Sequence, residues 1–425
     1  MLLAAVPRLL VALAGIANRP AIVSVDSLEY LALADQPDSY FGSGEELWRL
    51  ALRRPPGYPL LLAGPRALDG GVILSGLLQA LLSVAVVWLT WILGRELLGR
   101  RVGFVAAVWV AVDPATIVHM GRLLTEAPYT VLLLSASIFA LRALRSGSVG
   151  AAGLAGLCLA GATFVRPVLL YLPLLLLVVG LMATIAGRPV AKSVRPALAV
   201  LVAFVIPVGA WIGYVRSETG VALFSTIEGV NMLEYRAAGA RASDEGSTPA
   251  IARDELLVEL EAGLDSNANP AEVSRAARAL GIRTILDHPV GFTEVAARGA
   301  GRMLLGPARQ PSIEVTRDLP QASIASGVLT GAAIVSSVLM LLGAAWGIIL
   351  LFRRRAGTVL VVTTLPIAYH LVVASGADSD SRFRTPLVPY LAILAACAAV
   401  HAAARWRRRQ RDQGPAGVDV GSVRP

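Results

Sequence analysis

An acidic cluster follows the first apolar run of the chain. If residues 25–30 form a helix, Asp26, Glu29 and Tyr30 lie on one face of it, because residues three and four apart are neighbours on a helix surface. A carboxylate just outside a membrane can accept a proton from a substrate hydroxyl while the rest of the substrate remains in lipid. Asp26 is therefore a candidate general base. The alternative is that Asp26 only caps the following helix.

A proline-rich motif provides the second group of candidates. Arg54 is followed by two prolines and Gly57, which favour an extended entry into a short apolar helix that begins near Tyr58. This helix is too short to span a bilayer, so it suits a position at the membrane interface. There Arg54 could meet an anionic head group, unless the motif only anchors the chain at the interface.

An isolated acid and several arginines lie at the ends of other apolar runs. Glu126 comes just before the run of residues 129–144, and an ionisable residue at a membrane surface is a functional candidate by default. Arg166 lies alone between two runs, and Arg382 and Arg384 precede a proline that begins another. Such arginines favour an anionic partner, either a phosphate or a carboxylate of the protein itself.

The elements that must position these residues are apolar helices. Hydrophobic residues make up 56% and charged residues 16% of the 425 residues, whereas soluble domains average about 45–50% and about 25%. The apolar runs cover residues 2–17, 72–93, 102–118, 129–144, 151–165, 168–186, 197–214, 324–351, 358–375 and 387–404. The sequence therefore predicts an all-α polytopic membrane protein, a bundle of about ten transmembrane helices.

The basic residues indicate how this bundle lies in the membrane. The net charge of +9 comes from short arginine clusters between the apolar runs, which indicates topology rather than nucleic-acid binding. With the N-terminus inside, every strong cluster falls on the inner side, and both long outer segments are more acidic than basic. The candidate acids and arginines then all lie at the outer surface.

This topology divides the chain into four parts. Residues 1–215 form an N-terminal transmembrane bundle whose first outer loop, 26–70, carries the first two motifs. Residues 216–323 form a small outer domain, with helices predicted over 250–264 and 271–285 and a cap and first-turn proline at Asn269 and Pro270. Residues 324–404 form the C-terminal transmembrane helices, and 405–425 form a basic cytoplasmic tail that is predicted to be disordered.

The sequence contains no metal or nucleotide signature. The four histidines show no metal-ligand spacing, and the two cysteines lie in apolar runs. No glycine-rich phosphate loop is present. We therefore expect no metal and no cofactor.

In their order and topology, these motifs resemble the lipid-linked sugar transferases of the GT-C fold. The resemblance is closest to the protein mannosyltransferases (glycosyltransferase family 39) and to the bacterial aminoarabinose transferases of lipid A. Asp26 matches the catalytic Asp after their first helix, and the stretch from Arg54 to Leu61 resembles their Pro-Pro motif and interfacial helix. Glu126 matches an acid at the start of the fourth helix, and residues 382–386 resemble an Arg-x-Arg-x-Pro stretch.

The chain departs from this pattern at two positions. Ser27 stands where much of the family has a second acid, which leaves Glu29 or Glu126 for that role. Ala127 separates Glu126 from the proline that usually follows it directly. These departures concern the acceptor more than the class of reaction.

The resemblance implies an inverting hexosyl or pentosyl transferase that needs no divalent metal. The sugar would move from a polyprenyl-phosphate donor to a protein, lipid or glycan acceptor on the outer face of the bacterial plasma (inner) membrane. Asp26 would be the base, and Glu126 would orient the acceptor or an arginine. The residues expected to bind substrate are Glu29, Tyr30, Arg54, Tyr58, Arg166, Arg382 and Arg384. The alternatives are a transporter or flippase of a lipid-linked envelope precursor and a non-catalytic assembly subunit.

Overall fold

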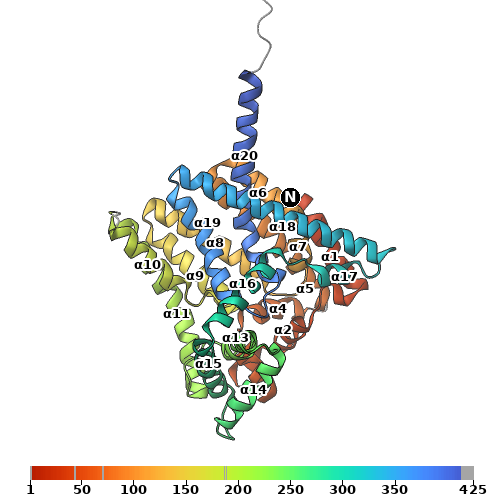
Figure 1. Cartoon of the computed structure of the whole chain (residues 1–425), viewed down its shortest axis with the longest axis vertical. Coiled ribbons are helices and arrows are strands. Elements are labelled where there is room, and N and C mark those ends of the chain that lie inside the picture. Colours follow the sequence, from red (N-terminus) through yellow and green to blue (C-terminus); the bar gives the residue numbers. More distant parts are fainter. Residues whose placement is uncertain (1, 43–44, 69–70, 186, 188, 413–425) are drawn as a thin grey trace, which may run out of the picture.

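The chain folds into a bundle of helices with a smaller group of helices at one end. The computed structural model describes residues 2–42, 45–68, 71–185, 187 and 189–412, and no strand occurs within these ranges. Helices α13 (Ala238–Glu245), α14 (Pro249–Ala262) and α15 (Pro270–Asp287) gather at one end of the bundle, and α20 (Val388–Asp412) projects from the opposite end (Figure 1). The predicted all-α class is confirmed.

The remaining elements follow in chain order. The bundle also contains α1 (Leu2–Ala17), α5 (Gly71–Leu98), α6 (Arg100–Val112), α7 (Pro114–Met120), α8 (Glu126–Ser146), α9 (Val149–Val165), α10 (Leu172–Ile185), α11 (Val194–Thr219), α18 (Ala322–Arg353) and α19 (Gly357–Ala374). Shorter elements join them or cover one end: η1 (Arg19–Ala21), α2 (Val25–Asp35), η2 (Pro37–Phe41), α3 (Glu45–Arg53), α4 (Gly57–Ala67), η3 (Pro167–Leu169), η4 (Val190–Lys192), α12 (Ile227–Val230), η5 (Asn231–Ala237), α16 (Pro289–Leu305), α17 (Arg309–Thr316) and η6 (Ser381–Leu387).

The apolar runs of the sequence correspond to helices throughout. Within the described ranges, seven helices are long and apolar enough to cross a membrane, and the bent pair α6 and α7 makes an eighth. Two shorter apolar helices, Leu2–Gly15 and Val149–Val165, account for the other predicted runs. The predicted tail is different, because α20 continues to Asp412 and residues 405–412 are helical rather than disordered. Residues 413–425 lie outside the described part of the chain.

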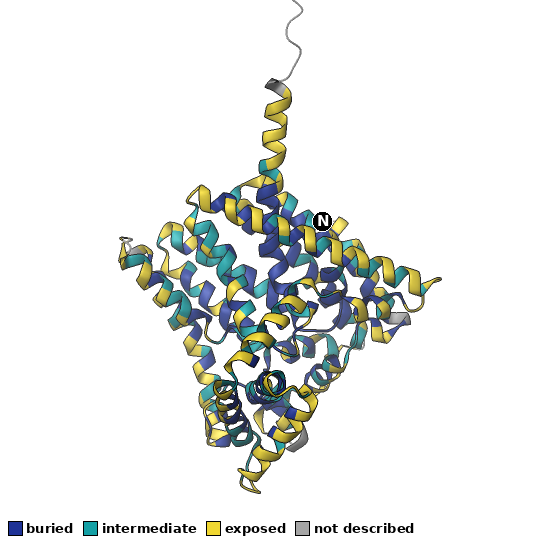
Figure 2. Ribbon diagram, in the orientation of Figure 1, coloured by how far each residue is buried: buried dark blue, intermediate teal, exposed yellow. Residues whose placement is uncertain are grey.

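The outward faces of the bundle are apolar. Figure 2 shows exposed positions along the outer side of α18 and α10, around a buried interior. Large hydrophobic side chains occupy many of these positions, among them Leu174, Met182, Leu339 and Leu342. A soluble protein rarely exposes so much contiguous apolar surface, whereas lipid tails cover it without any penalty.

Small residues allow the helices of the bundle to approach closely. A Cβ atom added to Gly103 of α6 would lie 2.6 Å from the Trp91 carbonyl oxygen of α5, and one added to Gly347 of α18 would clash with the Leu394 carbonyl of α20. Association through glycine contacts is typical of transmembrane helices, because lipid gives no hydrophobic force that would drive them together. The first contact packs α6 against α5, and the second packs α18 against α20.

A buried arginine stabilises the break between α6 and α7. Pro114 has no N–H to continue the helix, and the two segments meet at an angle of 64°. The Arg8 side chain of α1 is fully buried and donates hydrogen bonds to the carbonyls of Val110 and Ala111, at 2.9 Å each. The Asp113 carboxylate then accepts from the Thr116 N–H at 2.9 Å and caps α7.

Arg8→Leu is expected to destabilise the fold. The substitution leaves two buried carbonyls without a side-chain donor, which costs about 2–4 kcal/mol. The measurement is thermal unfolding in detergent, with Arg19→Leu as the control, because Arg19 is exposed just beyond the same helix. An Arg8→Leu variant with the Tm of the unmodified protein would contradict this role.

The polar segment 216–323 contains the helices predicted from its sequence. Helices α14 and α15 coincide with the predicted stretches 250–264 and 271–285. The Asn269 side chain accepts from the backbone N–H groups of Ala271 and Glu272, and the Glu272 carboxylate accepts from the Asn269 N–H, so the predicted cap is present as a capping box. The apolar core of this segment includes Leu233, Leu256 and Leu280.

Candidate functional site

The first turn of α2 presents the acidic cluster. Ser24 caps the helix, because its hydroxyl accepts from the Ser27 N–H while the Ser27 hydroxyl accepts from the Ser24 N–H. The interpretation of Asp26 as the helix cap is therefore wrong. Ser27, which replaces an expected second acid, has a structural role in this cap, and the Asp26 carboxylate is left to face the rest of the site.

Arg54 binds the acidic face of α2. It lies between the end of α3 and the two prolines before α4, and its Nη2 donates to Asp26 Oδ1 at 2.8 Å. Its Nε donates to Glu29 Oε2 at 2.5 Å, and its guanidinium carbon lies 5.1 Å from the centre of the Tyr30 ring. Asp26, Glu29 and Tyr30 therefore share one face of the helix, as their spacing predicts.

Arg382 joins the two candidate acids. It follows Asp380, whose side chain accepts from the Arg382 N–H and begins η6. Arg382 Nη1 donates to Asp26 Oδ2 at 2.6 Å, and Arg382 Nε donates to Glu126 Oε1 at 2.5 Å. Residues more than 250 positions apart in the sequence are thereby brought into one contact.

Glu126 is the most deeply buried member of the site. Its side chain is 0% exposed, and Oε1 also accepts from Arg166 Nη1 at 3.0 Å. Arg166 lies between α9 and η3, and its guanidinium carbon is 4.5 Å from the centre of the Phe383 ring. Glu126 Oε2 is buried without a hydrogen-bond partner among the described residues, so the acid keeps one free acceptor.

The site network is the set of six residues that these contacts connect. Acids and arginines alternate along it, in the order Glu29, Arg54, Asp26, Arg382, Glu126 and Arg166. Its formal charge is zero when every member is ionised. The sequence predicted either a phosphate or a protein carboxylate as the partner of these arginines. Their side chains bind protein carboxylates and also border a cavity that could admit a phosphate.

The cavity beside the network has a volume of about 230 Å³. Asp26, Tyr30, Arg54, Arg166 and Arg382 line it. Further lining residues come from the polar segment and from the last loop, namely Asn231, Tyr235, Arg236 and Asp378. Asn231, Tyr235 and Arg236 belong to η5, which is a π-helix. Such helices have no sequence signature, but they are frequent at functional sites.

Four of the candidate residues do not line the cavity: Glu29 and Glu126 belong to the site network beside it, whereas Arg384 and Tyr58 make other contacts. Arg384 is buried, and its Nη1 donates to the Leu304 carbonyl of α16. Tyr58 lies behind Tyr30, with the ring centres 5.0 Å apart, and its hydroxyl donates to Gln79 at 3.2 Å. Tyr58 therefore supports Tyr30, and Arg384 holds η6 against α16.

The arginines keep Asp26 ionised. Burial raises the pKa of Asp26, but Arg382 and then Arg54 lower it by more, so that it lies below its ordinary range. Burial lowers the pKa of Arg54, but the nearby Tyr30, Asp26 and Glu29 raise it by more. The pKa of Arg54 is therefore higher than its ordinary value. Asp26 is thus a carboxylate at neutral pH, with each of its oxygens occupied by one arginine.

Metal-binding groups are not clustered in this region. Among the described residues, no group of three or more His, Cys, Asp or Glu side chains is placed to hold a metal ion. The positive charge beside the carboxylates is supplied by guanidinium groups. Independence from metal stays a prediction.

Comparison with known proteins bears on the fold. The family model "Dolichyl-phosphate-mannose-protein mannosyltransferase" matches residues 53–211, which include Arg54, Glu126 and Arg166. The oligosaccharyltransferase of Archaeoglobus fulgidus in its apo form aligns over 97% of this chain with a TM-score of 0.54 at 12% identity. The same enzyme in complex with Zn and sulfate aligns over 96% of this chain with a TM-score of 0.55 at 14% identity. The chain has the GT-C fold.

The resemblance to GT-C proteins is thereby confirmed at the level of fold. The GT-C chain spans about half the length of the archaeal enzyme, at 52% and 50% in the two structures. ArnT from Cupriavidus metallidurans bound to undecaprenyl phosphate aligns over 97% of this chain and 80% of its own, with a TM-score of 0.39 at 16% identity. No curated protein sequence matches the chain.

Proposed function

We propose that this GT-C protein is an inverting glycosyltransferase that uses a polyprenyl-phosphate sugar as donor. One observation carries the proposal: Arg54, Arg166 and Arg382 converge on two carboxylates beside a single cavity. Guanidinium groups stabilise the charge of a departing phosphate, and a carboxylate activates an acceptor hydroxyl. A structure of the archaeal oligosaccharyltransferase in complex with an inhibitory peptide and a dolichol-phosphate agrees with such a donor.

The proposed reaction is a single displacement at the anomeric carbon. The acceptor oxygen forms a bond to this carbon as its proton passes to Asp26, and the bond from the carbon to the phosphate oxygen breaks. Polyprenyl phosphate leaves with that electron pair, and its charge is stabilised by Arg382, Arg54 and Arg166. Glu126 acts as a positioning residue, because it holds both Arg382 and Arg166.

The contacts of Asp26 favour binding of the donor before catalysis. Arg54 donates to Oδ1 and Arg382 donates to Oδ2, and both ion pairs make the Asp26 carboxylate a weaker base. A phosphate in the cavity competes for the same guanidinium groups. When Arg382 turns to the phosphate, Oδ2 of Asp26 becomes a free acceptor for the proton.

The proposed location is the outer face of a bacterial plasma membrane. The site network lies toward the end of the bundle that carries α13–α15, whereas the arginine-rich end of α20 projects on the opposite side (Figure 1). Clusters of basic residues favour the inner side of a membrane, so we assign the arginine-rich end of α20 to the inner side and the site to the outer side. The acceptor would be a protein, lipid or glycan of the envelope.

The test is a transfer assay with the full-length protein in liposomes. Polyprenyl-phosphate donors that carry labelled mannose, glucose or an aminopentose are mixed with envelope extract in a buffer that contains EDTA. The label that leaves the lipid fraction is then measured. Label that moves to a water-soluble or larger product supports the proposal. Donor that crosses the bilayer without losing its sugar would favour a flippase instead, and transfer that disappears in EDTA would refute metal independence.

Gly57→Val is expected to reduce transfer about 10–100-fold, because small displacements of reacting groups have effects of this size. A Cβ atom at Gly57 would lie 2.7 Å from the backbone carbon of Phe164, two residues before Arg166. Helix α4 would have to move away from α9, which separates Arg54 from Arg166. The measurement is kcat/KM for the labelled donor.

The control for this variant is Gly64→Val. Gly64 lies in the same helix, and a Cβ atom there has no neighbour within 4 Å. Equal activity of the two variants would show that the contact between α4 and α9 does not position the site.

A further inference from the structure

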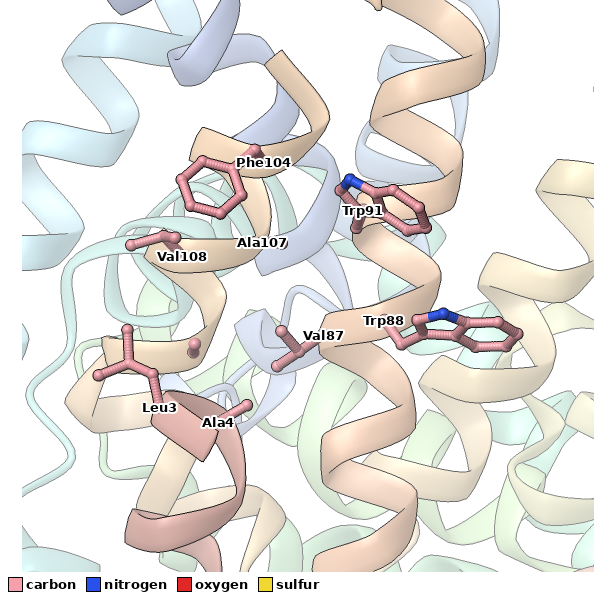
Figure 3. Close-up of a pocket in the computed structure, with 9 residues that line it drawn as sticks. Leu3, Ala4, Val87, Trp88, Trp91, Phe104, Ala107 and Val108 are labelled. Carbon is pink, nitrogen blue, oxygen red and sulfur yellow. The ribbon is translucent and has the colours of Figure 1, made fainter. Parts of the chain in front are cut away.

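Two neighbouring cavities lie at the end of the bundle opposite the site network. One has a volume of about 340 Å³ and lies between α1, α5 and α6, and the other has a volume of about 610 Å³ and lies between α6 and α20. Both are lined by Phe104, so the two cavities adjoin at this side chain. We call the pair of cavities the basal groove. Figure 3 shows its deeper half, where Phe104 and Val108 face Val87 and Trp91, with Leu3 and Ala4 nearby.

The deeper half of the basal groove is apolar. Among the described residues, every one that lines it is hydrophobic or aromatic, and none of them carries a charge. It reaches from Phe104 toward Ala111, near the end of α6. This half therefore lies within the depth of a membrane and suits a hydrocarbon chain.

The outer half of the groove combines an apolar floor with a basic rim. Ala399, Ala403 and other small residues of α20 form the floor, and Arg101, Arg407 and Arg408 stand at the rim. No hydrogen bond or ion pair joins these three arginines to any residue in the described part of the chain. Their like charges repel one another, so an anion between them would be bound favourably.

We infer that the basal groove binds one anionic phospholipid. Its phosphate would lie between Arg101 and the two arginines of α20, and an acyl chain would pass Phe104 into the deeper half. A soluble anion would leave the apolar half unfilled, and a zwitterionic lipid would bring a positive charge to an already basic rim. Phospholipid with net negative charge fits both halves.

The experiment compares two lipids that share the same acyl chains. Purified full-length protein is titrated with dioleoyl phosphatidylglycerol and with dioleoyl phosphatidylcholine, and retained lipid is counted by native mass spectrometry. We expect the first phosphatidylglycerol to bind about tenfold more tightly than phosphatidylcholine. In the double variant Arg407→Gln/Arg408→Gln this preference should fall to about twofold or less.

The matched control is Arg405→Gln/Arg409→Gln. These exposed arginines lie on the same helix, carry the same charge and do not line the groove. The control should keep the preference for phosphatidylglycerol. An equal loss in both double variants would indicate general attraction to net charge and would overturn the inference.

A third lipid tests the apolar half separately. Dihexanoyl phosphatidylglycerol has the same head group with short chains, so it should bind at least about tenfold more weakly than the dioleoyl lipid. Equal binding of the two would show that no acyl chain enters the groove. The groove could instead be covered by a second copy of the protein. A dimer that phosphatidylglycerol does not dissociate would therefore also overturn the inference. These readouts do not depend on transfer activity.

Discussion

Asp26→Asn is expected to reduce transfer about 10²–10⁴-fold, because the amide cannot take the proton of the acceptor hydroxyl. Asparagine has nearly the same shape as aspartate, so α2 and its Ser24 cap should remain intact. The measurement is kcat for the labelled donor in liposomes, together with the Tm of the variant. We expect the loss in kcat to exceed any change in donor binding.

Two variants of the same loop serve as controls for Asp26→Asn. Asp38→Asn changes an exposed acid that has no partner among the described residues, and it should transfer normally. Glu29→Gln removes the ion pair with Arg54 but keeps the Asp26 base. We therefore expect a smaller loss of transfer activity than in Asp26→Asn. Transfer by Asp26→Asn at the normal rate would remove Asp26 from the mechanism.

Arg382→Gln is expected to impair transfer and also to change its dependence on pH. The variant loses the guanidinium that bridges Asp26 and Glu126, and removal of such a charge at a developing anion reduces kcat about 10²–10³-fold. Burial, which raises the pKa of Asp26, is then opposed only by Arg54. The pKa of Asp26 should rise.

The direction of the pH effect follows from the role of Asp26 as a base. Only the carboxylate accepts a proton, so kcat/KM, which reports the enzyme before the donor binds, falls as the pH drops through the pKa of Asp26. In the unmodified protein this fall lies at lower pH than for an ordinary Asp, because the arginines lower the pKa of Asp26. In Arg382→Gln the fall should occur at higher pH.

The control for Arg382→Gln is Arg317→Gln. Arg317 is an exposed arginine after α17 and has no ion pair within the described ranges. Its substitution should leave both the rate and the pH profile unchanged. An Arg382→Gln variant whose residual activity keeps the original acid limb would show that Asp26 is not the titrating base.

The architecture follows from local features of the sequence. Hydropathy depends on composition over about 20 residues, so each apolar run marks a helix without knowledge of its neighbours. The common face of Asp26, Glu29 and Tyr30 follows in the same way from helical spacing. From the sequence, Asp26, Glu126 and Arg382 are predicted only to lie at the same depth near one membrane surface. Their direct contacts become visible only in the three-dimensional structure.

Irregular segments set the limit of such predictions. Arg382 and Arg384 are both plausible ligands for a phosphate in the sequence, and only the course of η6 turns Arg382 to the cavity and Arg384 to α16. No periodicity applies to a short turn. The contribution of Asn231 and Tyr235 was missed for a similar reason, since a π-helix is set by packing against its neighbours rather than by composition.

The helix that begins beside the site also ends beside the basal groove. Residues Ser381–Gln410 form a nearly continuous helical element, with Arg382 at one end and Arg407 and Arg408 near the other. Within this element, α20 is a stiff rod of about 37 Å that packs against α18 at Gly347. Since η6 leads directly into this rod, the position of Arg382 at one membrane surface is tied to the placement of α20 across the bundle.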